Sequence, residues 1–418
     1  MNLGYLRPAF MLQQPKIVHL TSVHTAFDVR VFHKECKSLA RSGKHVVLIV
    51  PHQRDEVVNS VEVKGIRING GRLVRMTRTV WSLYREALRQ NGDVYHFHDP
   101  ELIPLGLLLL ARGKTVVYDI HEDVPADILH KDYIPRRLRR PLTWSVRKLE
   151  DAACRRFSGL IAATPTIAKR FHSINPNTVV VHNFPMLDEI VPDVALPWNE
   201  RPPAVAYIGS ISERRGIREL LQALALLPSA NPTQMMLAGP FSPEELRTEL
   251  MRLPGWARVK YLRVLDRPSV ANLLSRVRLG LLVLQPEPNF WDAMPIKLFE
   301  YMAAGVPVIA SDFPLWRQII GEAGCGLLVD PQDPQAIARA MEYLLSHDAE
   351  AEAMGRRGRQ AACALYNWNS EERVLLKFYS ELLEPGARER EESPQVLRAP
   401  VDPQRQYQGQ VPGVAPYS

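Results

Sequence analysis

Short runs of apolar, β-branched residues alternate with longer stretches of helical periodicity through most of the chain. The first half contains six nearly continuous apolar runs, at 16–22, 45–51, 93–98, 115–121, 159–164 and 178–183. The second half contains six more, at 203–209, 233–239, 259–265, 279–285, 306–311 and 325–330. A parallel strand that is buried on both faces requires this continuous apolar character. The pattern therefore predicts two successive arrays of parallel strands and covering helices.

A proline-rich segment without clear periodicity, 184–203, separates the two arrays and is typical of a linker. Two βα arrays of similar size predict an α/β protein with two doubly wound, Rossmann-like domains that face each other across a cleft. The predicted organisation is a flexible tail at 1–15, an N-terminal domain at 16–190, a linker at 191–202, a C-terminal domain at 203–365, a helix at 366–384 and a disordered tail at 385–418.

Size and charge narrow the class of protein. A chain of 418 residues can form two separate cores, and its net charge of +7 suggests an anionic ligand or surface. The four cysteines have no CxxC spacing, which predicts free thiols in a reducing compartment. The longest apolar segment, 102–110, is shorter than the about 18 residues of a membrane span and is expected to be a buried helix. Without a signal-peptide pattern in the first 15 residues, we expect a cytoplasmic protein.

Polar residues gather where the predicted strands end, which is where doubly wound sheets bind ligands. A single histidine at such a position is more often structural, whereas several along one edge favour a binding site. In the first half these residues are Ser22, His24, His98, Asp99, His121, Glu122, Thr164, His182 and Asn183. In the second half they are Gly209, Ser210, Gly239, Gln285, Ser311 and Asp312.

A charged pair interrupts the apolar helix predicted at 295–304, which begins with Pro295 and is followed by Gly305. Lys297 lies in the first turn, where the helix dipole favours an anion rather than a cation. A bound diphosphate would explain the lysine, and Glu300 on the same face would accept hydrogen bonds from a ribose. A surface ion pair between the two residues explains the same spacing.

A second anion-binding candidate follows the strand at 203–209. A glycine turn, the basic pair Arg214–Arg215 and Gly216 lead into an amphipathic helix, although a solvated basic turn has the same pattern. Neither a G-x-G-x-x-G nor a P-loop motif occurs. H-x-x-x-H, H-E-x-x-H and D-x-D patterns are also missing where a metal could be held, so we expect no metal site.

The segment 131–157 is strongly basic, with nine Lys or Arg residues against three acids, and carries a tryptophan. A solvated helix on the outside of the sheet, a helix attracted to anionic lipid, and a nucleic-acid-binding face are all compatible with it. The candidate membrane-interface residues are Arg136, Arg137, Arg139, Arg140 and Trp144.

The second half resembles the donor-binding half of family 4 GT-B glycosyltransferases in three stretches: "YIGSISERRGI", "NFWDAMPIKLFEYMAAGVPVIASD" and "CGLLVDPQDPQAIARAM". The first half is similar to the acceptor-side domain of bacterial members that build surface polysaccharides. It shares "HLTSVHTAFDVRVFHKECKSLARSGKHVVLI", "DVYHFHDPELIPLG" and "YDIHEDVP". The resemblance implies retaining, metal-independent transfer of a sugar from a nucleotide-diphosphate sugar. It also implies that the helix at 366–383 returns to the first domain.

The resemblance implies roles for individual residues. Glu300 would hold the ribose, and Asp292, eight positions earlier where many members have glutamate, would address the donor sugar. His121 matches the histidine that acts beside that sugar, so His121 and Asp292 are the catalytic candidates. Ser210 stands where arginine is common in the family, and we infer that Lys297 supplies the missing charge. The donor-binding candidates are Ser210, Arg215, Gly216, Lys297, Leu298 and Glu300.

The expected acceptor is a glycan or a lipid-linked glycan at the inner face of the cytoplasmic membrane. Acceptor-side candidates are His24, Asp28, Arg30, His98 and Asp99. The nucleotide sugar is a co-substrate, and neither a cofactor nor a nucleic-acid partner is expected. Two alternatives are a GT-B nucleotide-sugar 2-epimerase and, in a different class, a non-catalytic membrane or nucleic-acid adaptor that uses the basic segment.

Overall fold

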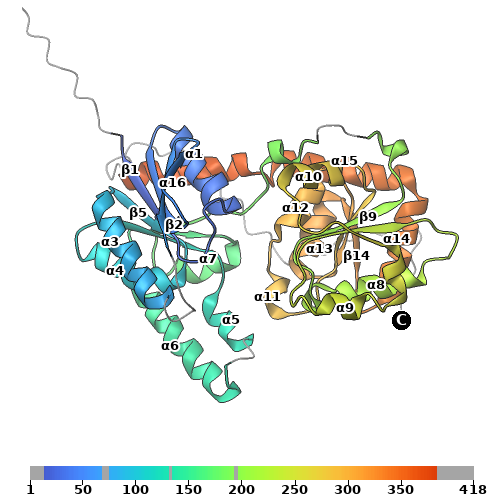
Figure 1. The fold of residues 1–418 in the computed structure, drawn as a ribbon, viewed down its shortest axis with the longest axis horizontal. Helices are drawn as coiled ribbons and strands as arrows, with labels where there is room; N and C mark the ends of the chain where they lie inside the picture. The colour runs from blue at the N-terminus through green and yellow to red at the C-terminus, as the bar shows by residue number, and fades with distance from the viewer. Residues whose placement is uncertain (1–13, 68–74, 131–133, 193–195, 384–418) are drawn as a thin grey trace, which may run out of the picture.

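The computed structural model describes residues 14–67, 75–130, 134–192 and 196–383. Two α/β domains lie side by side, each built around its own sheet (Figure 1). The disordered tail predicted at 385–418 lies outside the described residues, as does nearly all of the tail predicted at 1–15. The predicted GT-B-type arrangement of two doubly wound domains is confirmed.

The N-terminal sheet has eight strands in the order β3-β4-β2-β1-β5-β6-β7-β8. Their bounds are β1 Lys16–Leu20, β2 His45–Pro51, β3 Glu56–Val58, β4 Val61–Ile66, β5 Val94–Phe97, β6 Thr115–Ile120, β7 Gly159–Ala162 and β8 Thr178–Val180. Every neighbouring pair is parallel except β3 and β4. The carboxyl ends of β1, β5 and β6 therefore meet at one edge of the sheet.

The C-terminal sheet is wholly parallel, with the order β11-β10-β9-β12-β13-β14. Its strands are β9 Ala204–Ile208, β10 Gln234–Ala238, β11 Val259–Tyr261, β12 Leu279–Leu282, β13 Val308–Ser311 and β14 Gly326–Val329. All twelve predicted strands are present. The β3–β4 hairpin was missed because its strands lie at the sheet edge and alternate in burial, so they lack a continuous apolar run.

Helices cover both faces of each sheet. In the N-terminal domain these are η1 Val29–Cys36, α1 Lys37–Arg41, η2 Arg75–Thr79, α3 Val80–Gln90, η3 Pro100–Leu102, α4 Ile103–Leu110, α5 Val124–His130, α6 Arg136–Cys154 and α7 Pro165–Phe171. The crossover contains η4 Leu187–Ile190 and η5 Trp198–Glu200. The C-terminal domain has η6 Glu213–Arg215, α8 Ile217–Leu226, α9 Leu246–Leu250, η7 Pro254–Arg258, α10 Arg267–Leu274, α11 Pro288–Trp291, α12 Ile296–Ala303, α13 Pro314–Ala323, α14 Pro334–Ser346 and α15 Asp348–Ala364.

The last helix, α16 Trp368–Leu383, packs on the N-terminal domain rather than on the domain that precedes it (Figure 1). Trp368, Leu375 and Phe378 are buried in the same core as β1, β2 and η1. The Trp368 indole N–H donates to the Ser38 hydroxyl at 3.0 Å, and the His182 backbone N–H donates to the Glu371 carboxylate at 2.9 Å. These contacts link the end of the chain to the domain in which it began.

Helix α4 accounts for the long apolar segment near residue 105, since Leu102, Leu105 and Leu109 are fully buried in the N-terminal core. Among the described residues, no helix combines the length and the apolar character that crossing a bilayer requires. All four cysteines are free, as predicted.

Candidate active site

Three glycines bring backbone segments of the C-terminal domain into close contact. Gly209 (φ 115°) follows β9, and Gly239 (φ 142°) follows β10. A Cβ at Gly239 would lie 1.9 Å from the Gly209 carbonyl oxygen, and a Cβ at Gly216 would lie 2.0 Å from that of Val283. Side chains are therefore disfavoured at these positions, and the turns after β9 and β10 pack closely against each other.

Lys297, the second residue of α12, points toward this glycine turn. Its ammonium group lies 4.4 Å from the centre of the Tyr207 ring and has no hydrogen-bond partner among the described residues. A Cβ built at Gly209 would lie 3.4 Å from Lys297 Nζ and 3.9 Å from Arg215 Nη1. Burial, and then the charge of Arg215, lower the pKa of Lys297 to about 7. Two cations thus converge at the start of a helix, where the backbone also favours an anion.

Glu300 does not pair with Lys297, so the surface ion pair allowed by the sequence spacing is not formed. Its carboxylate is 4% exposed and accepts a hydrogen bond from Arg267 Nη1 at 2.5 Å. The Nε–H of Arg267 donates to Glu189 at 2.9 Å in the interdomain crossover. Arg267 therefore links the predicted ribose-binding residue to the segment that joins the domains. It was missed in the sequence, although it is a cation in the first turn of α10, the same anomaly that drew attention to Lys297.

The other predicted donor residues differ in their surroundings. Asp292 is exposed at the end of α11, and the Ser210 carbonyl accepts a hydrogen bond from the Tyr207 hydroxyl at 2.8 Å. The side chain of Leu298 is fully buried in the core, and its N–H donates to the Pro295 carbonyl at 3.1 Å. Apolar packing accounts for the side chain of Leu298, and its role in donor binding stays a prediction.

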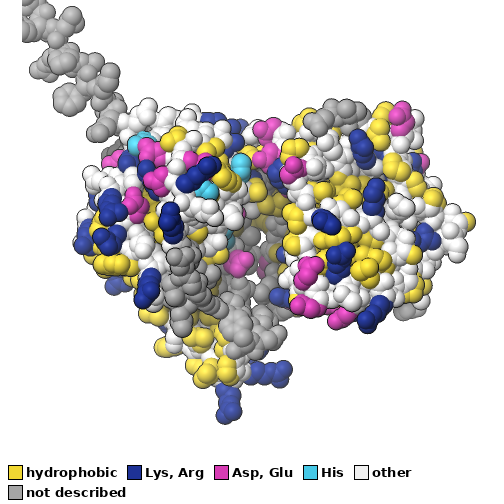
Figure 2. Space-filling view, viewed as in Figure 1, with side chains coloured by type: hydrophobic (Ala, Val, Ile, Leu, Met, Phe, Trp, Pro, Cys, Tyr) yellow, Lys and Arg dark blue, Asp and Glu magenta, His cyan; other side chains and the backbone are white. Residues whose placement is uncertain are grey.

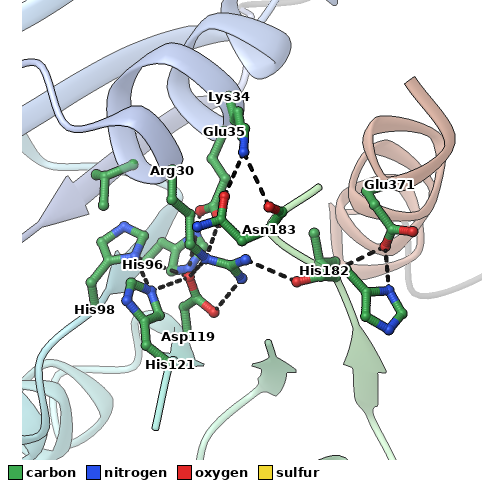
Figure 3. Close-up of polar contacts among 12 residues, drawn as sticks. Arg30, Lys34, Glu35, His96, His98, Asp119, His121, His182, Asn183 and Glu371 are labelled. Atoms are coloured by element: carbon green, nitrogen blue, oxygen red, sulfur yellow. Dashed lines mark hydrogen bonds and ion pairs between the residues drawn. The ribbon is translucent and has the colours of Figure 1, made fainter. Parts of the chain in front are cut away.

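In the N-terminal domain, Asp119 at the end of β6 is the centre of a buried polar network (Figure 3). Arg30 donates to both of its oxygens, at 3.0 and 2.8 Å, while His98 Nδ1 and His121 Nε2 lie 3.1 and 2.7 Å from Oδ2. Burial alone would raise the pKa of Asp119, but Arg30 and His121 hold it well below its usual range. Asp119 is therefore ionised and fixes the orientation of the His121 ring.

His121 and His24 are the accessible members of the predicted site in this domain, with side chains 20% and 23% exposed and ring centres 5.2 Å apart. Burial lowers the pKa of His98 to about 4, although Asp119 opposes the shift. His98, Arg30 and Asp99 are almost completely buried. These three residues stay acceptor-side predictions, and their burial favours a supporting role behind His24 and His121.

The two aspartates predicted for the acceptor side stabilise local structure. Asp28 begins η1, where its carboxylate accepts hydrogen bonds from the backbone N–H groups of Arg30 and Val31 at 2.8 and 2.9 Å. Asp99 accepts from the Thr21 hydroxyl at 2.8 Å and the Ser22 N–H at 2.6 Å, and lies 3.2 Å from His24 Nδ1. Asp99 thus positions His24 much as Asp119 positions His121.

Lys34 and Asn183 form a contact that the sequence interpretation missed. Lys34 Nζ donates to Asn183 Oδ1 at 2.5 Å, which links η1 to the start of the crossover (Figure 3). Burial and Arg30 lower the pKa of Lys34 to about 7, and the charge of Glu300 acts in the opposite direction. Glu300 on α12 is therefore close enough to η1 for its charge to act across the two domains.

The basic helix α6 projects from the N-terminal domain together with α5, away from both sheets (Figure 1). The lower tip of the molecule in Figure 2 shows apolar and cationic side chains together. Leu138, Trp144 and Leu149 are 56%, 64% and 71% exposed, and Arg136, Arg137 and Arg140 are also exposed. Arg139 differs from the other arginines, because its guanidinium donates to the carbonyls of Ile134 and Leu129.

Both domains match known families. Residues 28–185 match the family described as Glycosyltransferase Family 4, and residues 193–361 match Glycosyl transferases group 1. The chain belongs to glycosyltransferase family 4 and has the GT-B fold. Among the predicted site residues, the structure brings Arg215 and Lys297 together beside Gly209 in one domain and His24 with His121 in the other.

Named relatives agree with this family. The chain is 32% identical to D-inositol 3-phosphate glycosyltransferase of Corynebacterium urealyticum over 43% of each chain. It is 26% identical to phosphatidyl-myo-inositol mannosyltransferase of Mycobacterium tuberculosis H37Rv, over 71% of this chain and 75% of that one. The chain thus spans less than half the length of the first relative. HepE of Anabaena, solved with UDP and glucose, has the same fold, with a TM-score of 0.67 and 16% identity over 88% of this chain and 100% of that one.

Proposed function

We propose that this family 4 glycosyltransferase transfers a sugar, with retention of anomeric configuration, from a nucleotide-diphosphate sugar to a glycan or lipid-linked acceptor in surface-polysaccharide synthesis. One observation carries the proposal. The buried ammonium of Lys297 and the guanidinium of Arg215 converge at Gly209, and Lys297 lacks a partner among the described side chains. A diphosphate would supply the two or more anionic oxygens that such a site needs.

The same two cations suit the chemistry of the proposed reaction. The bond between the anomeric carbon and the diphosphate oxygen breaks, so negative charge develops on the leaving phosphate. Lys297, Arg215 and the N-terminus of α12 would stabilise that charge, as fixed dipoles and charges do in a site that excludes water. The acceptor oxygen bonds to the same face of the sugar, and its proton passes to the departing phosphate oxygen. In this scheme the positive charge comes from side chains and not from a metal.

Glu300 would accept hydrogen bonds from the ribose hydroxyls after the hydrogen bond from Arg267 to its carboxylate weakens. Since Arg267 also holds Glu189 in the crossover, donor binding would alter a contact that joins the domains. Asp292, exposed on the loop before α12, would face the sugar. His121, oriented by Asp119, would approach the sugar from the N-terminal domain across the gap seen in Figure 2. Closure of that gap would exclude water from the reacting atoms.

The acceptor side of the proposal rests on α6. A helix that exposes tryptophan and leucine beside arginines is suited to binding at the surface of a membrane that contains anionic lipid. Each basic residue contributes about 1 kcal/mol to the attraction. The M. tuberculosis relative is named for a phosphatidyl-inositol substrate. We therefore propose a lipid-linked acceptor at the inner membrane face, with α6 as the membrane contact.

A thermal-shift screen with UDP-, GDP-, ADP- and dTDP-sugars tests the donor site directly. At least one nucleotide sugar should raise the melting temperature, and the response should disappear in the Lys297→Met variant. Failure of every nucleotide to stabilise the protein would refute the proposal. For the active donor, proton NMR of the first product formed should show the anomeric configuration of the donor.

The two alternatives predict different results. A 2-epimerase would convert the nucleotide sugar without an acceptor, and it is not favoured, because the named relatives are transferases. An adaptor would tolerate Glu300→Ala and lose function when the exposed arginines of α6 are reversed in charge. For the proposed enzyme, assayed with a soluble acceptor analogue, Glu300→Ala should reduce activity more than charge reversal of the exposed α6 arginines.

A further inference from the structure

A buried cluster of three histidines and one glutamate lies under η1, on one face of the N-terminal sheet. His19 on β1 is paired in register with His96 on β5, and His98 follows two residues later, so all three side chains share a face. Glu35 on η1 lies over them. Each of the four residues is at most 2% exposed.

We propose that His19, His96, His98 and Glu35 bind one Zn²⁺ ion that ties η1 to the sheet. Each residue offers one ligand atom, and the four atoms lie within 4.8 Å of one another. His98 Nε2 lies 3.0 Å from His19 Nδ1, and His96 Nε2 lies 3.9 Å from Glu35 Oε2. Tetrahedral zinc with bonds of about 2.0–2.1 Å separates its ligand atoms by roughly 3.4 Å, which is within the range of these two distances.

Four polar atoms in this cluster have no hydrogen-bond partner in the described part of the protein. They are His19 Nε2, His96 Nε2 and both oxygens of Glu35. Glu35 Oε1 lies 3.0 Å from Arg30 Nε, but that N–H is directed at Asp119. Leaving buried polar atoms without a partner is unfavourable. A cation bound between His96 Nε2 and Glu35 would satisfy that imidazole nitrogen and the carboxylate at once.

The outer nitrogens of two of the histidines have the partners that zinc ligands usually have. His98 Nδ1 lies 3.1 Å from the Asp119 carboxylate, which leaves His98 Nε2 to face the cluster. His96 Nδ1 lies 2.7 Å from the hydroxyl of Tyr379 on α16, which leaves His96 Nε2 in the same position. Carboxylates and hydroxyls at the second ring nitrogen fix the orientation of metal-ligating histidines. Figure 3 shows His98 beside Asp119, with His96 and Glu35 nearby.

The donor set and its burial determine the kind of metal site. Three imidazoles and one carboxylate suit Zn²⁺, and four protein ligands with no open position make a structural site rather than a catalytic one. The ion would therefore be compatible with a sugar transfer that uses no metal. No sequence motif predicts this group, because its members come from β1, η1 and the end of β5 and are far apart in the sequence. Zinc binding at this cluster would not depend on the proposed sugar transfer.

Metal analysis of the full chain, purified without a polyhistidine tag from zinc-supplemented cells, tests this proposal. We expect one zinc ion per chain, retained through gel filtration. The Glu35→Gln and His96→Gln variants should lose it. The control His45→Gln, which changes a half-exposed histidine paired with Glu62, should keep it. X-ray absorption of the wild-type protein should show nitrogen and oxygen ligands at about 2.0–2.1 Å with the outer-shell signal of imidazole.

The wild-type measurements decide the question even if the variants fail to fold. Folded wild-type protein without stoichiometric metal would overturn the proposal, with ordered water left to fill the cluster. Zinc retained equally by Glu35→Gln, His96→Gln and the control would also overturn it, because the ion would then be bound elsewhere. Replacement of zinc by Co²⁺ with the visible spectrum of a tetrahedral site would support it.

Discussion

Replacing Lys297 with methionine should stabilise the ligand-free protein and weaken donor binding. Lys297 is 8% exposed, and its buried ammonium has no anionic partner at hydrogen-bonding distance among the described residues, so folding must desolvate a charge without compensation. Methionine has similar length and keeps the apolar contact with the Tyr207 ring. The variant would therefore be more stable than the wild type but would bind the nucleotide diphosphate less tightly.

The size of the effect follows from the pKa of Lys297, which burial lowers from 10.5 to about 7. At 1.36 kcal/mol per pH unit, this shift costs the native state about 4 kcal/mol at pH 7. The cation–π contact with Tyr207 at 4.4 Å offsets about 1–2 kcal/mol. We therefore expect Lys297→Met to raise the stability of the C-terminal domain by about 2–3 kcal/mol, or roughly 4–12 °C in melting temperature.

The gain should depend on pH. The native pKa lies below the unfolded pKa, so from pH 7 to 10.5 the unfolded chain holds a proton that the native protein lacks. Native stability therefore rises with pH in this window, and the cost of burying Lys297 is full only below pH 7. The advantage of the variant should shrink by more than half between pH 7 and pH 9.

Differential scanning calorimetry at pH 6, 7, 8 and 9 measures both quantities, with and without the nucleotide found by the screen. Lys260→Met on β11 makes the same change of charge at an exposed position, and it should alter neither stability nor nucleotide binding. Donor affinity of Lys297→Met should fall on the order of 10–100-fold, the usual loss for a charge-assisted hydrogen bond. A variant that is less stable than the wild type, or that still responds fully to nucleotide, would refute the reasoning.

Three further predictions concern the other parts of the site. His121→Asn should lower kcat about 100-fold, with little change in donor KM or melting temperature because the ring is partly exposed. The control is His172→Asn, which changes an exposed histidine. If turnover is unchanged in His121→Asn, His121 takes no part in the mechanism. Asp292→Glu should retain much of the activity while Asp292→Asn loses most of it in steady-state assays; equal rates would show that the charge is not used. Reversing three exposed α6 charges should greatly reduce sedimentation with anionic vesicles and leave neutral vesicles unaffected, whereas reversing Arg252, Lys260 and Arg276 should not. The α6 positions are Arg136, Arg137 and Arg140.

The sheets could be predicted from the sequence because parallel strands covered on both faces have a one-dimensional signature. Strands such as β12 place Leu279 and Leu281 in one core and Leu282 in the other, so every position is apolar. Neither β3 nor β4 has this signature, since β3 is the edge strand and buried residues alternate with partly exposed ones at the start of β4. Burial on two faces, and not strand propensity, made the prediction possible.

The site was only partly predictable, because the position of a residue in the sequence does not show how deeply its side chain is buried. His98 and His121 both end strands, yet the first is covered and the second is accessible. Lys297 was noticed because a cation is anomalous in the first turn of an apolar helix. Lys34 and Glu35 interrupt η1 in the same way and were not noticed, and both proved to be buried in polar clusters. Arg267 reaches Glu300, the predicted ribose-binding residue, through a tertiary contact that no local pattern contains.

The central claim is that the cations beside Gly209 hold a nucleotide diphosphate without help from a metal. Isothermal titration of the wild-type protein with UDP, GDP, ADP and dTDP, in buffer containing EDTA, tests it most directly. We predict saturable 1:1 binding of at least one nucleotide, strongly weakened in Lys297→Met and unchanged in Lys260→Met. Absence of binding for all four nucleotides, or equal affinity in the two variants, would contradict the claim.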